Sequence, residues 1–93
     1  MELAGRVVLV TGASRGIGAA LAPQLTAHGA TVGIVARRAD RLENVLAECR
    51  GIAPDSRMWS ADLGDIDTAE RVAREAVEQF GRVDAIVNNA AIG

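Results

Sequence analysis

The residues best suited to chemistry lie in a glycine-rich segment, residues 11–18, with the spacing Gly-x-x-x-Gly-x-Gly. Gly12 allows a tight turn after a strand, Gly16 lets the backbone approach a pyrophosphate, and Gly18 lets a helix pack closely on a sheet. The start of such a helix offers unpaired N–H groups and a partial positive charge. The segment therefore predicts a phosphate-binding site. A purely structural glycine turn is the alternative.

The segments around this turn alternate between strand-like and helical periodicity, which is typical of an α/β fold with a parallel sheet. Strands are expected at about residues 6–10, 31–36, 58–61 and 83–88. Helices are expected from near Gly16 to a stop at Gly29, and at about residues 40–50 and 66–80, with Asp65 or Asp67 capping the last one. We therefore expect a Rossmann-like doubly wound parallel sheet, present as its N-terminal half with four strands and three helices.

The helical spacing also predicts which side chains face the core. In the first helix these are Ile17, Leu21 and Leu25, although Pro23 removes one backbone donor there and predicts a kink. In the second helix they are Leu42, Val45, Leu46 and Cys49. In the third helix they are Ile66, Ala69, Val72, Ala73, Ala76, Val77 and Phe80. The spacing places Cys49 among packed side chains, so a buried thiol is expected rather than a reactive one.

Composition excludes several classes of function. The 93 residues carry a net charge of -2, which gives no clustered positive charge for nucleic acid. The apolar run at residues 7–10 is far shorter than the roughly 20 residues that span a bilayer, so a cytoplasmic protein without a membrane role is expected. One cysteine permits no internal disulfide or cysteine metal cluster, and no metal site is predicted. All ten basic residues are arginine, and lysine and tyrosine are absent.

The chain resembles the short-chain dehydrogenase/reductase family over all 93 residues, because it has three motifs of that family in the order in which the family has them. They are the glycine segment, Asp62-Leu63 after the third expected strand, and residues 84–91 at the fourth, which read DAIVNNAA. Ala91 stands where the family usually has glycine. The resemblance implies a nicotinamide cofactor bound by this part of the chain.

The resemblance also implies roles for individual residues. The phosphates would be lined by Ser14, Arg15, Gly16 and Ile17. Asp62 would accept a hydrogen bond from the adenine amino group with help from the Leu63 backbone, and Asn89 and Ala90 would approach the nicotinamide-side ribose. All three segments follow strand ends, where open α/β sheets bind ligands. Asp62 as a cap of the next loop and Asn89 as a loop stabiliser are the structural alternatives.

The tip of the second strand favours NADP over NAD. NAD-binding proteins usually place a carboxylate there, whereas this chain has Arg37 and Arg38, which together with Arg15 suit a 2′-phosphate. Asp40 is close in sequence, but capping of the following helix accounts for it. The alternative is that Arg38 is only a solvated residue at the helix start.

In the family, hydride transfer relies on a serine and on a Tyr-x-x-x-Lys pair beyond the fourth strand, so no catalytic residue is predicted in this sequence. His28 falls at the end of the first helix, away from the ligand-binding edge. Half a dinucleotide sheet also leaves an apolar outer strand bare. We therefore expect residues 1–93 to be the N-terminal part of a single dinucleotide-binding domain in a longer enzyme.

That enzyme would transfer hydride between NADP(H) and a small carbonyl or alcohol substrate, and the resemblance implies a homodimer or homotetramer. The alternative is a short, non-catalytic module that binds a nucleotide or pairs with another subunit through its open sheet edge.

Overall fold

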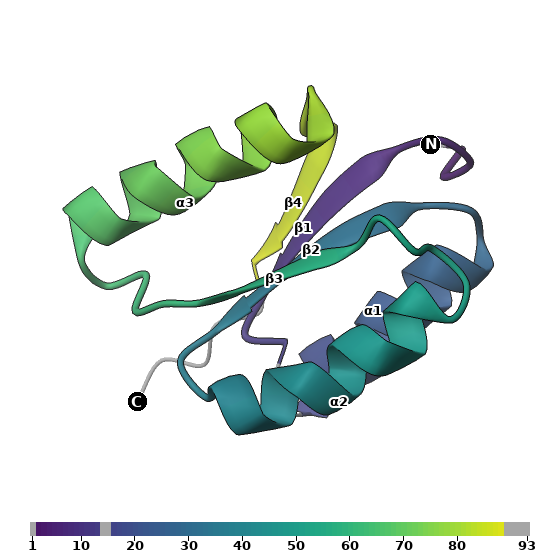
Figure 1. Cartoon of the computed structure of the whole chain (residues 1–93), viewed down its shortest axis with the longest axis horizontal. Helices are drawn as coiled ribbons and strands as arrows, with labels where there is room; N and C mark the ends of the chain where they lie inside the picture. The colour runs from purple at the N-terminus through teal and green to yellow at the C-terminus, as the bar shows by residue number, and fades with distance from the viewer. Residues whose placement is uncertain (1, 14–15, 89–93) are drawn as a thin grey trace.

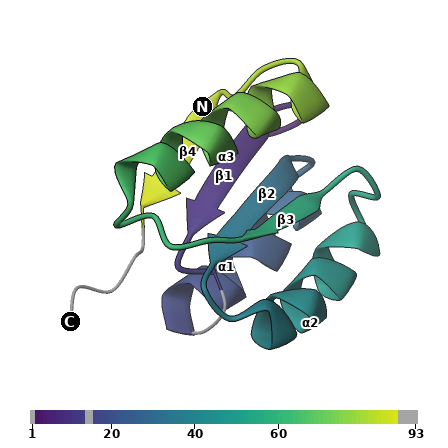
Figure 2. The same cartoon turned by 60° about the vertical axis from the view of Figure 1, so that its left-hand side comes forward.

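The computed structural model describes residues 2–13 and 16–88. The elements follow in the order β1 (Val7–Thr11), α1 (Gly16–Ala27), β2 (Thr31–Ala36), α2 (Ala39–Arg50), β3 (Arg57–Ser60), α3 (Ile66–Phe80) and β4 (Ala85–Asn88). The strands form one parallel sheet in the order β3-β2-β1-β4. Helices α1 and α2 cover one face and α3 the other (Figures 1 and 2). This arrangement confirms the expected Rossmann-like half with four strands and three helices.

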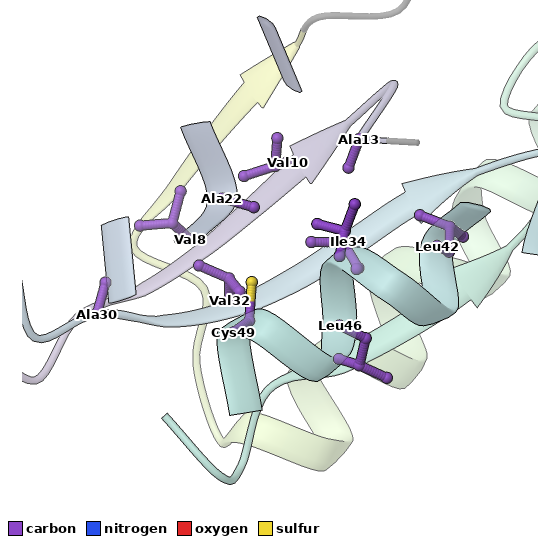
Figure 3. Close-up of a cluster of buried hydrophobic side chains, with 11 residues drawn as sticks. Val8, Val10, Ala13, Ala22, Ala30, Val32, Ile34, Leu42, Leu46 and Cys49 are labelled. Atoms are coloured by element: carbon purple, nitrogen blue, oxygen red, sulfur yellow. The ribbon is translucent and has the colours of Figure 1, made fainter. Parts of the chain in front are cut away.

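The core lies between the central strands and the α1–α2 face. Strand β1 is buried throughout and β2 at its four inner positions, as expected for β-branched strands covered on both faces. Figure 3 shows this cluster, to which β1, β2, α1 and α2 all contribute. Its labelled members are Val8, Val10, Ala13, Ala22, Ala30, Val32, Ile34, Leu42, Leu46 and Cys49. The predicted inner face of α2 is confirmed, since Leu42, Val45, Leu46 and Cys49 are all buried.

The predicted inner face of α1 is only partly correct, since Leu25 packs against the core whereas Ile17 faces away from it. Ile17 is 74% exposed, Leu21 and Leu25 are only half-buried, and the buried positions are Gly18, Ala22 and Thr26. These small side chains at i, i+4 and i+8 let the helix backbone lie close to its neighbours, so the larger residues flank the contact. Pro23 lies inside a helix that continues to Ala27.

The predicted inner face of α3 is only partly correct. Val72 and Ala76 are buried, whereas Ile66 is 73% and Val77 49% exposed, and Ala73 is exposed. An apolar groove lies between α3 and strands β1 and β4, lined by Leu9, Ala73, Val77, Val83, Asp84, Ala85 and Ile86. Within the described part of the chain no element covers this side of α3, so the apolar stripe is wider than its buried contact.

Helix ends follow the expected chemistry. Asp65 caps α3 by accepting hydrogen bonds from the Asp67 N–H and the Thr68 hydroxyl. Gly81 ends α3 with a φ of 81°, and Gly29 follows α1 with a φ of 95°. Strand β2 has the predicted bounds, while β1 and β3 are shifted by one residue and β4 begins two residues late.

Candidate functional site

The carboxyl ends of four parallel strands meet at one edge of the sheet. Thr11 pairs with Val35 of β2 and with Asn88 of β4, and Ala36 pairs with Ser60 of β3. The segments that leave these strands therefore start side by side at the same edge (Figure 1). Loops at this edge of an open parallel sheet form the usual ligand-binding crevice.

Two glycines, Gly12 and Gly16, stand at the described ends of the segment that joins β1 to α1. Gly12 and Gly16 have φ angles of 66° and 63°, a conformation that favours glycine. A Cβ on Gly16 would meet no atom within 4 Å, so open space lies over the first residue of α1. The Ala13 N–H donates to the Val35 carbonyl over 3.3 Å and ties the turn to β2. This exposed, open helix start fits a phosphate group.

The structure describes some of the remaining residues of the glycine segment and not others. Gly18 is buried in α1, as its packing role requires, and Ile17 is exposed at the helix start. Ser14 and Arg15 lie outside the described residues. Their roles toward the phosphates, and the convergence of Arg15 with the arginines after β2, stay predictions.

The structure shows a side-chain contact between β1 and β4 at this edge that the sequence did not lead us to expect. The Thr11 hydroxyl donates to Asn88 Oδ1 over 2.9 Å and lies 3.4 Å from the Val87 carbonyl. Two polar residues at the ends of adjacent strands are the only signal that could have suggested it. The contact holds the end of β4, which leads directly into Asn89 and Ala90, two predicted site residues outside the described part.

The tip of β2 presents two exposed arginines, Arg37 and Arg38, directly after the strand. The Ser60 hydroxyl donates to the Arg37 carbonyl over 3.1 Å, which fixes the backbone at this point. Arg38 is the N-cap residue of α2 and makes no side-chain cap. Exposed cations on a fixed backbone beside the glycine turn suit a phosphate group.

The structure corrects the role expected for Asp40. Asp40 does not cap α2, since it lies in the first turn of the helix rather than at the N-cap. Its Oδ1 instead lies 3.5 Å from the Arg38 Nε. The hydrogen bond and charge of Arg38 hold the pKa of the Asp40 carboxyl below its ordinary value. Asp40 is therefore an ionised carboxylate at the tip of β2, where the sequence-based interpretation placed no functional acid.

Asp62 lies after β3 on the same edge, and its side chain organises the following loop. Asp62 Oδ1 accepts a hydrogen bond from the Gly64 N–H over 2.9 Å, and its carbonyl accepts one from the Asp65 N–H. This is the loop-capping alternative, and it leaves the exposed carboxylate with further acceptor capacity toward an adenine amino group. Leu63 beside it is half-buried.

The remaining titratable candidates lie away from this edge. His28 is exposed between α1 and the start of β2, at the opposite edge of the sheet. Cys49 is buried, and burial raises the pKa of its thiol to about 11. Residues 2–13 and 16–88 contain no cluster of three metal-ligating side chains and no helix long and apolar enough to cross a membrane.

Known proteins are similar to this chain in both sequence and fold. The family model described as short chain dehydrogenase matches residues 6–93. An 11-beta-hydroxysteroid dehydrogenase-like protein (4A) of Arabidopsis thaliana is 43% identical over 89 residues, which are 95% of this chain and 30% of that protein. The chain thus spans 26–30% of the length of such relatives.

Solved structures agree in fold. A metagenomic short-chain oxidoreductase in complex with NADP superposes with a TM-score of 0.90 at 39% identity, covering 100% of this chain and 42% of that one. The glucose dehydrogenase of Caenorhabditis elegans gives 0.90 at 30% identity, covering 100% and 40%. Taken with the glycine turn and the parallel half-sheet, these matches place the chain in the short-chain dehydrogenase family.

Proposed function

We propose that this chain is the cofactor-binding part of an NADP(H)-dependent oxidoreductase that interconverts a small carbonyl and its alcohol. The single observation that carries the proposal is the β1–α1 turn, where Gly12 and Gly16 have positive φ angles and open space lies over the start of α1. A pyrophosphate requires such a cradle of backbone N–H groups.

The bound cofactor would supply or accept hydride, and the residues of this chain would bind and orient it. The turn would hold the pyrophosphate, while Asp62 and Leu63 after β3 would face the adenine. Thr11 fixes the end of β4, from which Asn89 and Ala90 would approach the nicotinamide-side ribose. No residue among the 93 is assigned to proton transfer, which the family resemblance gives to a serine, a tyrosine and a lysine.

Preference for NADP over NAD is supported by the two exposed arginines at the tip of β2. A 2′-phosphate can accept charge-assisted hydrogen bonds from guanidinium groups, each contributing about 1.5–3 kcal/mol. One similar structure was solved in complex with NADP. The proposal includes a homo-oligomeric enzyme, as the family resemblance implies, and the cytoplasmic location expected from the sequence.

The substitution Arg37→Asp tests the cofactor preference. We expect the ratio of the NADH to the NADPH dissociation constants to fall at least tenfold, measured by titration of the full natural polypeptide. Arg74→Asp is the matched control, since Arg74 is exposed on α3, on the other face of the sheet. An unchanged ratio in Arg37→Asp would show that this arginine does not read the 2′-phosphate.

A second candidate function is a non-catalytic module that binds nucleotide or pairs with another subunit. The observation that favours it is the apolar groove between α3 and β4, which is the outermost strand in the described part of the chain, where Ile86 is 62% exposed. NADPH oxidation with a panel of aldehydes and ketones separates the two functions. Turnover supports the oxidoreductase, whereas NADPH binding with no turnover across the panel supports the module.

A further inference from the structure

Arg38 and Asp40 form an exposed ion pair just beyond β2. Arg38 Nε lies 3.5 Å from Asp40 Oδ1, and the two side chains are 62% and 69% exposed. The pair follows the end of β2, about 20 residues beyond the glycine segment, where dinucleotide-binding folds usually recognise the adenosine ribose. A carboxylate and a guanidinium at this point favour opposite cofactors, since the carboxylate suits ribose hydroxyls and the guanidinium suits a 2′-phosphate.

Three hydrogen bonds hold the backbone around this pair. The Ala61 N–H donates to the Ala36 carbonyl over 2.9 Å, and the Leu42 N–H donates to the Arg38 carbonyl over 3.1 Å. The Ser60 hydroxyl binds the Arg37 carbonyl between them. A ligand at this point therefore meets a hydrogen-bonded main chain and an exposed Arg38 side chain.

The Arg38–Asp40 contact is also weak enough to be exchanged. An ion pair this exposed gains little, because water competes for both groups and two flexible side chains must be ordered. A phosphate monoester carries close to two negative charges at neutral pH and can bind a guanidinium through two parallel hydrogen bonds. The guanidinium thus has a stronger partner available than the single carboxylate oxygen it contacts.

We propose that Asp40 is a specificity-determining residue that competes with the 2′-phosphate of NADP for the Arg38 guanidinium. The inference rests on the proposed function and extends it to a residue that the family motifs do not include. Asp40 limits the preference for NADP, because its carboxylate occupies the Nε–H of Arg38, one of the donors with which a guanidinium binds a phosphate through two parallel hydrogen bonds.

The substitution Asp40→Asn removes the charge and keeps the shape. We expect the full natural polypeptide carrying it to bind NADPH about fivefold more tightly, the size expected for one unit charge about 4 Å away in water. NADH affinity should not change. Glu48→Gln is the matched control, because Glu48 is also an exposed acid on α2, about 12 Å further along the helix.

A second background separates competition from simple repulsion. In a protein that already carries Arg38→Gln, Asp40→Asn should change NADPH affinity by less than about twofold. Most of the roughly fivefold effect should be lost there, because the guanidinium for which Asp40 and the phosphate compete is gone. A gain that persists in this background would overturn the competition. So would a weaker affinity for NADH in Asp40→Asn with NADPH unchanged, since Asp40 would then bind the ribose hydroxyls.

The two levels of the proposal fail differently. If Asp40→Asn and Glu48→Gln behave alike while Arg37→Asp still lowers the preference for NADPH, the role of Asp40 is wrong and the proposed function stands. If the wild-type protein binds NADH as tightly as NADPH and Arg37→Asp changes nothing, the NADP assignment itself is wrong, and the role of Asp40 fails with it.

Discussion

Thr11 and Asn88 are 77 positions apart in sequence and are joined by a hydrogen bond at the ligand-binding edge, with 2.9 Å between Thr11 Oγ1 and Asn88 Oδ1. They are also register partners at the ends of β1 and β4. The two strands are thus locked together by a side-chain contact at the point where the chain leaves the sheet for the candidate site.

Replacing Thr11 by valine removes this donor and nearly keeps the shape of the side chain. We expect the free energy of unfolding to fall by about 0.5–1.5 kcal/mol, the usual net value of one hydrogen bond. Denaturant unfolding measures the change. Thr11→Ser is the control, because it keeps the hydroxyl, and a valine variant as stable as wild type would contradict the role of the bond.

At the opposite edge of the sheet, Asp84 ties the start of β4 to the start of β1. Its Oδ2 accepts the Val7 N–H over 2.8 Å and the Arg82 Nε–H over 3.0 Å, and Oδ1 lies 3.5 Å from Arg6 Nη1. The Val7 hydrogen bond, followed by the charge of Arg82, lowers the pKa of Asp84 from its ordinary value of 3.8.

This lowered pKa predicts a specific pH dependence. Because the folded state binds the Asp84 proton less tightly than the unfolded state, the stabilisation is present above about pH 4 and is lost as the pH falls through the folded-state pKa. Asp84→Asn should therefore be less stable than wild type at pH 7, and the difference should shrink below pH 4. Unfolding at a series of pH values tests this.

Asp55→Asn serves as the control for the pH series, since Asp55 is an exposed loop residue. It should not reproduce the convergence with wild type at low pH. A stability difference between Asp84→Asn and wild type that stays constant from pH 7 to pH 3 would mean that the Asp84 carboxylate does not provide the stabilisation.

The sequence was most informative where an element is buried on both sides. Strand β2 was predicted to the residue because its inner positions form an apolar run with no polar face. Helix α2 was predicted with its inner face because Leu42, Val45, Leu46 and Cys49 all reach the same core. The glycine turn was predictable because its positive φ angles demand a particular residue type.

The sequence was less informative where contact depends on the neighbour. Ile17 has the periodicity of a core residue, but α1 makes its buried contact through Gly18 and Ala22, so side-chain size misled the prediction. Val77 belongs to a true apolar stripe that no described element covers. The Arg38–Asp40 pair depends on the rotamers of two surface side chains, and the Thr11–Asn88 hydrogen bond depends on the register of two strands. Hydrophobic periodicity predicts neither rotamers nor register.

The buried Cys49 predicts an unreactive thiol. Burial raises its pKa to about 11, mainly by desolvation, so about one molecule in a thousand carries the thiolate at pH 8. We expect the peptide containing Cys49 to remain unlabelled by an alkylating reagent in the native protein and to be labelled fully in denaturant, as read by mass spectrometry. Rapid labelling of that peptide under native conditions would contradict the packing of α2.

Gly29 and Gly81 offer a matched comparison at two helix ends. Both have positive φ angles, of 95° and 81°, so an alanine at either position is strained by about 1 kcal/mol. A Cβ at Gly81 would meet nothing within 4 Å, whereas one at Gly29 would lie 2.9 Å from Ala4 Cα.

The segment that carries Ala4 cannot retreat freely, because the Gly5 N–H is bonded to the Gly29 carbonyl over 3.1 Å. We therefore expect Gly81→Ala to cost about 1 kcal/mol and Gly29→Ala about 2–4 kcal/mol, the excess coming from overpacking against the backbone. Denaturant midpoints of the two variants test this directly. Equal costs would show that residues 3–6 move aside. The hydrogen bond between Gly5 and Gly29 would then add little to stability.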